Sequence, residues 1–144
     1  MILPDINILI HAYNAGSSLH SAARDWWETA LIDGEPVGLA WVVALGFIRL
    51  STNPAVAAQP LPVSKACAIV ESWLATSRVS FLHPGARHAS ILFDLLRRAG
   101  SGGNLTTDAH LAALALEHDV ELCSTDSDFK LFPGLRWQNP LLGR

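Results

Sequence analysis

The sequence has little of three features that would each point to a particular class of protein. Its two cysteines, Cys67 and Cys123, lie far apart and form neither a disulfide framework nor a pair of metal ligands. The apolar stretch from Pro36 to Ile48 is well short of the ~20 residues that a membrane-spanning helix needs. The formal net charge is -3, so the chain also lacks the basic excess that is usual in nucleic-acid-binding proteins. We therefore expect neither a disulfide-stapled fold nor a membrane protein.

The size of the chain suits one globular domain. A chain of 144 residues with 50% apolar residues can bury a substantial core, so we expect a single domain over residues 1–144. Because cysteines are few and no apolar segment with a cleavage site follows Met1, we expect a cytoplasmic protein with reduced thiols. Adjacent arginines, Arg97 and Arg98, can still form part of a basic face, so the negative net charge does not exclude RNA as a ligand.

Short apolar runs alternate with longer segments of helical period, which is typical of strand–helix–strand units around a parallel sheet. The pattern predicts an α/β fold. The apolar runs predict strands at residues 1–3, 37–39, 79–81 and 121–124, with a possible fifth at residues 135–137. The periodic segments predict helices over residues 6–13, 20–32, 40–51, 64–74 and 85–99, and one from residue 106 or 107 to 118.

Three aspartates occupy positions where such a sheet gathers functional groups. Asp5 and Asp126 come just after predicted strands, and Asp108 opens a predicted helix that leads into another strand. Ligands of open parallel sheets bind beyond the carboxyl ends of the strands, where the strand order reverses. The three carboxylates are therefore expected to converge on one edge of the sheet.

A cluster of carboxylates needs a compensating charge, because like charges in a partly dry cleft repel and raise one another's pKa values. Hard divalent cations prefer oxygen ligands, and Mg2+ is commonly held by one or two carboxylates together with waters and substrate phosphates. The lack of histidine or cysteine partners favours Mg2+ or Mn2+ over zinc. Such a site can activate a water for in-line attack on a phosphodiester.

Each aspartate also has a purely structural interpretation. Asp5 can cap the first helix, and Asp108 suits the first turn of its helix because the macrodipole favours a negative charge there. Asp126 and Asp128 can form an Asx turn. Taken one by one, these interpretations are at least as good as a metal site, so spacing alone leaves both open.

In order along the chain, these residues resemble the pattern of the PIN-domain ribonucleases of the VapC toxin type. The resemblance runs nearly from end to end. A single segment of this kind would be weak evidence, but four in the right order are specific. The four are LPDIN at residues 3–7, GFIR followed by TNP within residues 46–54, NLTTDAHLAALA at residues 104–115, and TDSDF followed by FPGL within residues 125–135.

The resemblance implies a three-layer α/β/α sandwich with a parallel sheet of about five strands, the PIN-like fold. It implies the toxin of a type II toxin-antitoxin system, which hydrolyses RNA with Mg2+ or Mn2+ and is inhibited by a cognate antitoxin protein. Homodimers are the rule in that family. By position, Asp5, Asp108 and Asp126 match its catalytic and metal-binding acids, and Asp128 matches a further acid that often assists.

One position departs from the family pattern. Most members carry a glutamate three residues before an arginine, and here Gly46 stands in that place before Arg49. A glycine inside a helix costs ~1 kcal/mol relative to alanine, so close packing or room for waters is expected in return. We expect an opening beside Gly46, where waters replace the absent carboxylate, unless Glu71 or Asp94 supplies one from elsewhere.

Two polar residues outside the acidic set are assigned to substrate binding as a hypothesis. Arg49 can contact a substrate phosphate or pair with Asp5, or it can simply be a cation that the dipole at the end of its helix stabilises. Asn104 can orient an acid or the scissile phosphate, or it can only shape its loop.

Other functions also stay open. A catalytically eroded PIN-like interaction module would bind a protein partner without cleaving RNA, and Gly46 supports this alternative. Asp126 and Asp128 could instead be the nucleophile pair of an aspartyl phosphatase, although such a pair should follow the first strand. The six histidines show no ligand spacing, and the five tryptophans are expected to be core or interface anchors.

Overall fold

The computed structural model describes residues 1–142 as five strands, six α-helices and one 3-10 helix. The strands are β1 (Ile2–Pro4), β2 (Val37–Leu39), β3 (Val79–Phe81), β4 (Glu121–Cys123) and β5 (Trp137–Gln138). The helices are α1 (Ile6–Tyr13), α2 (His20–Asp33), α3 (Trp41–Thr52), α4 (Val63–Leu74), α5 (His88–Ala99), α6 (Leu105–His118) and the 3-10 helix η1 (Ser127–Leu131).

The five strands form one parallel sheet in the order β3-β2-β1-β4-β5. The chain builds outward from β1 to β3 and then returns to place β4 on the free side of β1. The strand order therefore reverses between β1 and β4. The register there sets Leu3 beside Leu122 and Pro4 beside Cys123, so these two strands end together.

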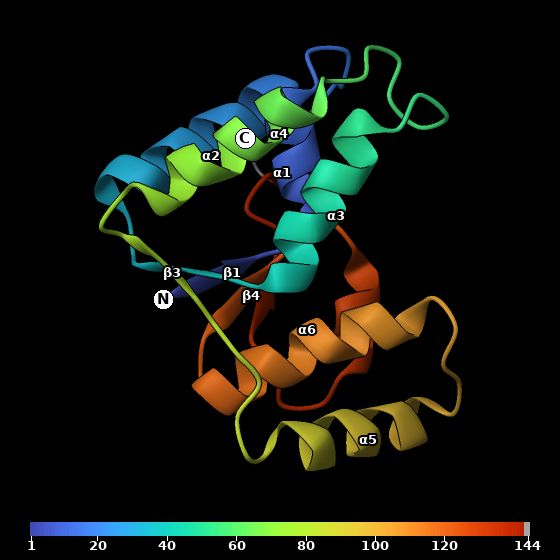
Figure 1. The fold of residues 1–144 in the computed structure, drawn as a ribbon. Coiled ribbons are helices and arrows are strands. Elements are labelled where there is room, and N and C mark those ends of the chain that lie inside the picture. The colour runs from blue at the N-terminus through green and yellow to red at the C-terminus, as the bar shows by residue number, and fades with distance from the viewer. Residues whose placement is uncertain (143–144) are drawn as a thin grey trace.

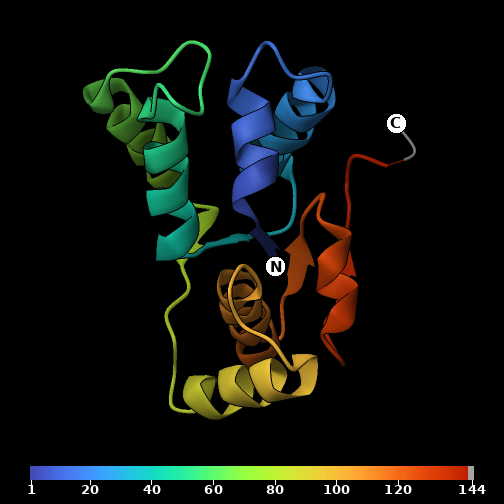
Figure 2. The same cartoon turned by 90° about the vertical axis from the view of Figure 1, so that its right-hand side faces the viewer.

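Helices cover both faces of the sheet. α1 to α4 lie on one face, and α5 and α6 lie on the other (Figures 1 and 2). Right-handed crossovers require this change of face, because the connections from β1 to β3 run in one direction across the sheet and the return to β4 runs in the other. The expected three-layer α/β/α sandwich with a five-stranded parallel sheet is confirmed.

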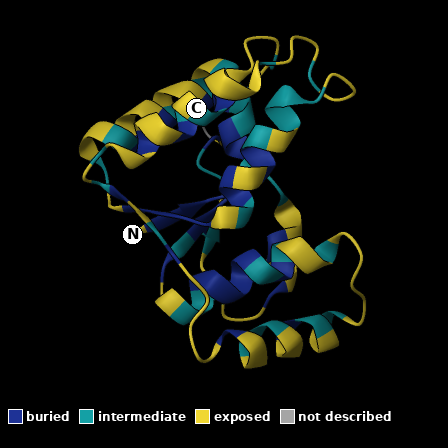
Figure 3. Cartoon of the chain, viewed as in Figure 1, coloured by how far each residue is buried: buried dark blue, intermediate teal, exposed yellow. Residues whose placement is uncertain are grey.

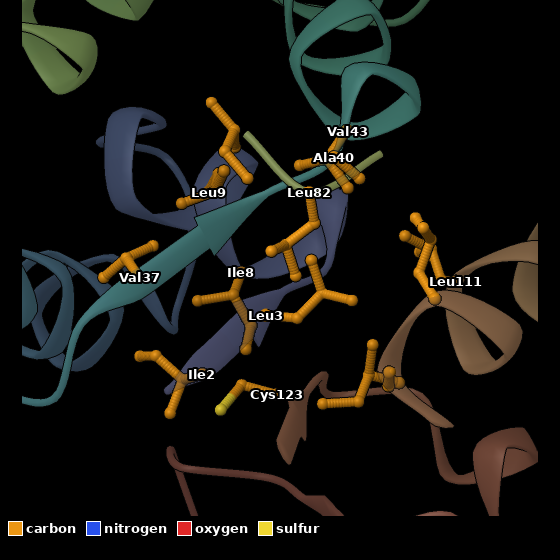
Figure 4. Close-up of a cluster of buried hydrophobic side chains, with 14 of the residues drawn as sticks. Ile2, Leu3, Ile8, Leu9, Val37, Ala40, Val43, Leu82, Leu111 and Cys123 are labelled. Carbon is orange, nitrogen blue, oxygen red and sulfur yellow. The ribbon is translucent and has the colours of Figure 1, made fainter. Parts of the chain in front are cut away.

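Both faces of the sheet are buried at β1 and β2, which explains why these strands read as short continuous apolar runs. Leu3, Val37 and Leu122 have no exposed surface and belong to the buried core, in which Figure 4 labels Leu3 and Val37. α6 is buried along much of its length between the sheet and α5, as Figure 3 shows. Among residues 1–142, no helix has both the length and the apolar character that crossing a membrane requires.

Several boundaries differ from those predicted. Pro4 continues β1 instead of ending it, and it lies in register with Cys123 of β4. α6 begins at Leu105, before either threonine that was expected to cap it. The turn expected after Asp126 continues as η1.

Candidate active site

Asp5 lies just beyond the end of β1 and is also the N-cap of α1. Its Oδ1 accepts a hydrogen bond from the backbone N of Ile6 at 2.7 Å, and its Oδ2 accepts one from Ser124 Oγ at 2.7 Å. Burial raises the pKa of the Asp5 carboxyl, and these two hydrogen bonds oppose the rise. The structural and the functional interpretations of Asp5 are therefore compatible, since one oxygen caps the helix and the other faces the adjoining strand end.

Ser124 ties the ends of β1 and β4 together. Its fully buried hydroxyl donates to Asp5 and accepts from the backbone N of Asp126 at 3.0 Å and from Asn7 Nδ2 at 3.1 Å. Asn7 Oδ1 in turn accepts from the backbone N of Thr125 at 3.3 Å. The hydroxyl thus uses its donor and both its acceptor positions, and it fixes the separation of the two loops that carry Asp5 and Asp126.

Sequence reasoning did not single out Ser124 or Asn7, although a signal existed. Asn7 lies two residues after Asp5, and Ser124 lies two residues before Asp126 at the end of an apolar run. A polar side chain that is buried there needs a hydrogen-bonding partner.

Asp126 and Asp128 begin η1. Asp126 caps this helix because its Oδ1 accepts from the backbone N of Asp128 at 2.9 Å, which is the Asx turn expected from the sequence. Asp126 is half-buried and Asp128 is exposed. The turn uses only Oδ1 of Asp126, so its Oδ2 is left for a ligand.

Asp108 brings α6 into the same group of acids. It lies in the first turn of the helix and is half-buried. Burial raises the pKa of the Asp108 carboxyl to about 6, and the negative charges of Asp5, Asp126 and Asp128 contribute to the rise. The structure therefore brings all four predicted acids within electrostatic reach of one another, at the sheet edge where the strand order reverses.

The donors of this acidic cluster, Asp5, Asp108, Asp126 and Asp128, fit a hard divalent cation. All are carboxylate oxygens, and a cation among them would relieve the repulsion that raises the pKa of Asp108. Within residues 1–142, no three histidine, cysteine, aspartate or glutamate side chains form a ready-made ligand set. A bound ion would thus have to draw the four carboxylates closer together.

The two residues assigned to substrate binding make no contact with the acids. Arg49 is exposed in the last turn of α3, and it forms no ion pair within the part of the chain that the structure describes, so the expected pairing with Asp5 is not found. Asn104 is the residue before α6, but its side chain makes no capping hydrogen bond. Of the two substitute acids considered, Asp94 instead pairs with Arg98 at 2.9 Å on α5.

The predicted opening beside Gly46 is wrong. Gly46 is buried, and a Cβ built on it would lie 2.5 Å from Ile6 Cδ1 and 3.0 Å from Ile6 Cγ1. The side chain of Ile6 therefore fills the space next to this glycine. Close packing of α3 against α1, the other expectation, explains the residue.

Two histidines pair between α5 and α6, which their spacing did not predict. His88 Nε2 lies 2.9 Å from His110 Nδ1 and joins α5 to α6, two residues beyond Asp108. His88 Nδ1 lies 3.9 Å from Glu117 Oε1 and has no hydrogen-bond partner within the described residues. Burial lowers the pKa values of both histidines, so the pair is neutral at pH 7.

Comparison with known proteins gives three concordant findings. The PIN domain family matches residues 2–135 of the chain. Ribonuclease VapC37 of Mycobacterium tuberculosis is 43% identical over 140 residues, which cover 97% of each chain. Ribonuclease VapC33 of the same organism is 40% identical over 141 residues, covering 98% of this chain and 99% of the relative. The crystal structure of VapBC2 from Rickettsia felis, bound to a DNA fragment from their promoter, matches in fold with a TM-score of 0.69 at 17% identity, covering 96% of this chain and 98% of the other.

Proposed function

The chain belongs to the PIN domain family, and on this premise we propose that it is the toxin of a type II toxin-antitoxin system, an endoribonuclease that hydrolyses RNA phosphodiester bonds. Its relatives VapC37 and VapC33 are named ribonucleases, and the similarity to them spans nearly the whole of each chain. We propose further that residues 1–144 form a single PIN-like nuclease domain that acts in the cytoplasm.

The observation that carries this proposal is the gathering of the four carboxylates at the carboxyl ends of β1 and β4. Asp5 and Asp126 follow the two strands between which the strand order reverses, and burial together with their charges raises the pKa of Asp108 on the neighbouring helix. Grouping like charges in this way is unfavourable for folding, and it becomes useful once a cation binds. We therefore assign Asp5, Asp108 and Asp126 to catalysis and metal binding, with Asp128 as a further ligand.

We propose Mg2+ as the metal, with Mn2+ as a substitute. When bound, the cation would supply the charge that activates a water and stabilises the leaving oxygen of the phosphodiester. Ser124 favours the ionised form of Asp5 by donating to its Oδ2. The exposed guanidinium of Arg49 and the unengaged amide of Asn104 are proposed to bind substrate phosphate.

The proposed partners are a cognate antitoxin protein and a second copy of the chain in a homodimer. The fold match to VapBC2 supports the antitoxin partner. The second rests on the family resemblance.

The test is cleavage of bacterial total RNA with Mg2+ or Mn2+. Asp5→Asn and Asp108→Asn should each abolish cleavage, whereas Asp33→Asn, at the exposed end of α2, should leave it unchanged. If wild type and Asp5→Asn cleave alike, the assignment is wrong. If calorimetry finds no divalent binding while the antitoxin still binds, the chain is the eroded interaction module instead.

A further inference from the structure

Among residues 1–142, two glycines receive an apolar side chain where their own Cβ would be. At Gly46 of α3, a Cβ would lie 2.5 Å from Ile6 Cδ1, and at Gly38 of β2 it would lie 2.5 Å from Leu82 Cδ1. Cβ contacts below 3.0 Å essentially never occur in real proteins, so an added methyl group would force movement at either place. The two contacts are alike in geometry but lie in different parts of the molecule.

The Ile6–Gly46 contact lies next to the acidic cluster. Ile6 is the first residue of α1, and its backbone N donates to Asp5 Oδ1 at 2.7 Å. The position of this N–H therefore helps to set the position of the Asp5 carboxylate. The side chain of the same residue is held by the backbone of α3 at Gly46.

A methyl group at position 46 would not be absorbed by the Ile6 side chain alone. Rotation about χ2 can remove Cδ1, but Cγ1 would still lie 3.0 Å from the new Cβ. Rotation about χ1 is restricted because β-branched residues in helices have one strongly preferred χ1 rotamer. The start of α1 or the backbone of α3 would thus have to shift, by a few tenths of an ångström to about 0.5 Å, which is the tolerance of a preorganised site.

We infer that Ile6, seated on Gly46, is a positioning residue that fixes the Asp5 carboxylate for metal binding. This inference rests on the proposed function, because it assigns a role toward the metal to a residue that is not a ligand. It also gives a reason for the glycine: its cost of ~1 kcal/mol within a helix is offset by the close approach that it allows.

The test is the affinity for Mn2+ alone, measured by calorimetry on the full chain, together with the melting temperature of the metal-free protein. Gly46→Ala should weaken Mn2+ binding on the order of 10-fold, the effect usual for groups that orient a ligand. Adding Ile6→Val, which removes Cδ1, should restore part of the affinity, because the 3.0 Å contact of Cγ1 then remains. Gly38→Ala is the matched control, because it should lower the melting temperature through its clash with Leu82 and leave Mn2+ affinity unchanged.

A second comparison covers the case in which Gly46→Ala does not fold. Ile6→Ala alone removes Cδ1, Cγ1 and Cγ2 and leaves a void at Gly46, part of which the alanine methyl group of the double variant Gly46→Ala with Ile6→Ala fills. This double variant should therefore bind Mn2+ more tightly than Ile6→Ala. Equal affinities of these two variants, or unchanged affinity in a folded Gly46→Ala, would overturn the inference.

A wild type that binds no Mn2+ would refute the proposed metal site. A separate measurement then tests whether the contact of Ile6 with Gly46 sets the position of Asp5. The backbone amides of Ile6 and Asp126 donate to Asp5 and Ser124, respectively, so their NMR resonances report on the site without metal. Gly46→Ala should shift both resonances, and Gly38→Ala should leave them in place. Unshifted resonances in Gly46→Ala would overturn the inference.

Discussion

Asp108 carries an unfavourable negative charge in the metal-free protein. Partial burial, and then three neighbouring carboxylates, raise its pKa from the ordinary value of 3.8 to about 6. The folded state thus holds the Asp108 proton more tightly than the unfolded state does, so this group lowers the stability as the pH rises from about 4 to 6. The acids of the proposed metal site thus reduce the stability of the metal-free protein.

We predict that Asp108→Asn raises the stability of the metal-free protein at pH 8. The gain should be about 1 kcal/mol, or roughly 2–4 °C in melting temperature, because water screens much of the repulsion at a half-exposed carboxylate. The gain should shrink toward pH 4, where Asp108 of the wild type is protonated. Thermal unfolding with a chelator present measures both effects. A variant less stable than wild type at pH 8 would contradict the electrostatic explanation, and Asp33→Asn should show no such pH dependence.

Ser124 is the residue on which the geometry of the acidic cluster depends most. Ser124→Ala removes the donor to Asp5 and the acceptor for the backbone N of Asp126, both in a buried setting. We expect the free energy of unfolding to fall by about 1–3 kcal/mol, and the pKa of Asp5 to rise further because a hydrogen bond that lowers it is lost.

Denaturant unfolding and Mn2+ calorimetry measure the effect of Ser124→Ala. The matched control is Ser90→Ala on α5, since that exposed hydroxyl donates only to a carbonyl one turn earlier, that of Arg87. Equal losses of stability in the two variants would show that the buried hydroxyl has no special role.

At the scale of elements, α5 depends on α6 for its attachment to the molecule. Glu117 of α6 fixes the start of α5, because its carboxylate accepts the backbone N–H groups of Gly85 and Arg87 at 2.7 and 2.9 Å. The histidine pair adds a buried polar link between the two helices.

We predict that the attachment of α5 weakens in mild acid. Burial lowers the pKa of His88, with Glu117 opposing the shift and His118 adding to it, and His110 is its direct partner. A base with a lowered pKa binds fewer protons when folded, so its contribution is present above the ordinary value of 6.5 and is lost as the pH falls below it. Amide hydrogen exchange of α5, corrected for the intrinsic rate, should show reduced protection at pH 5.5 relative to pH 7.5.

His88→Gln tests the origin of this pH dependence, since glutamine is polar but does not titrate. The loss of protection between pH 7.5 and 5.5 should be smaller in the variant than in the wild type. An unchanged pH dependence would assign the effect to groups other than His88.

For the whole molecule, the acidic cluster joins segments that are distant in sequence. Asp5, Asp108 and Asp126 belong to the β1–α1 junction, α6 and the β4–η1 junction, respectively. A cation bound by all of them would therefore oppose global unfolding and not only local opening.

We predict that divalent metal raises the melting temperature of the whole chain. Mn2+ at 100 times its Kd should add about 2.7 kcal/mol to the free energy of unfolding, or roughly 5–10 °C. Chelation should reverse the shift, and Asp126→Asn should reduce it strongly. A shift of equal size in wild type and Asp126→Asn would place the bound metal elsewhere.

Fold class, most element positions and the candidate acids follow from the sequence alone. Short apolar runs and helical periodicity are local signals, and a strand buried on both faces makes them strong, as at Val37–Leu39. The four motifs in order identified the family, and the ends of β1 and β4 placed Asp5 and Asp126 where parallel sheets bind ligands. Their roles as ligands remain predictions.

The contacts between segments that are far apart along the chain could be read only from the tertiary structure. It showed that Ile6 fills the space at Gly46, that Ser124 links Asp5 to Asp126, and that α5 begins at His88 because Glu117 accepts the preceding N–H groups. The physical reason is the same in each case. Periodicity and capping preferences depend on neighbours within a few residues, whereas packing and buried hydrogen bonds depend on partners that the fold brings together.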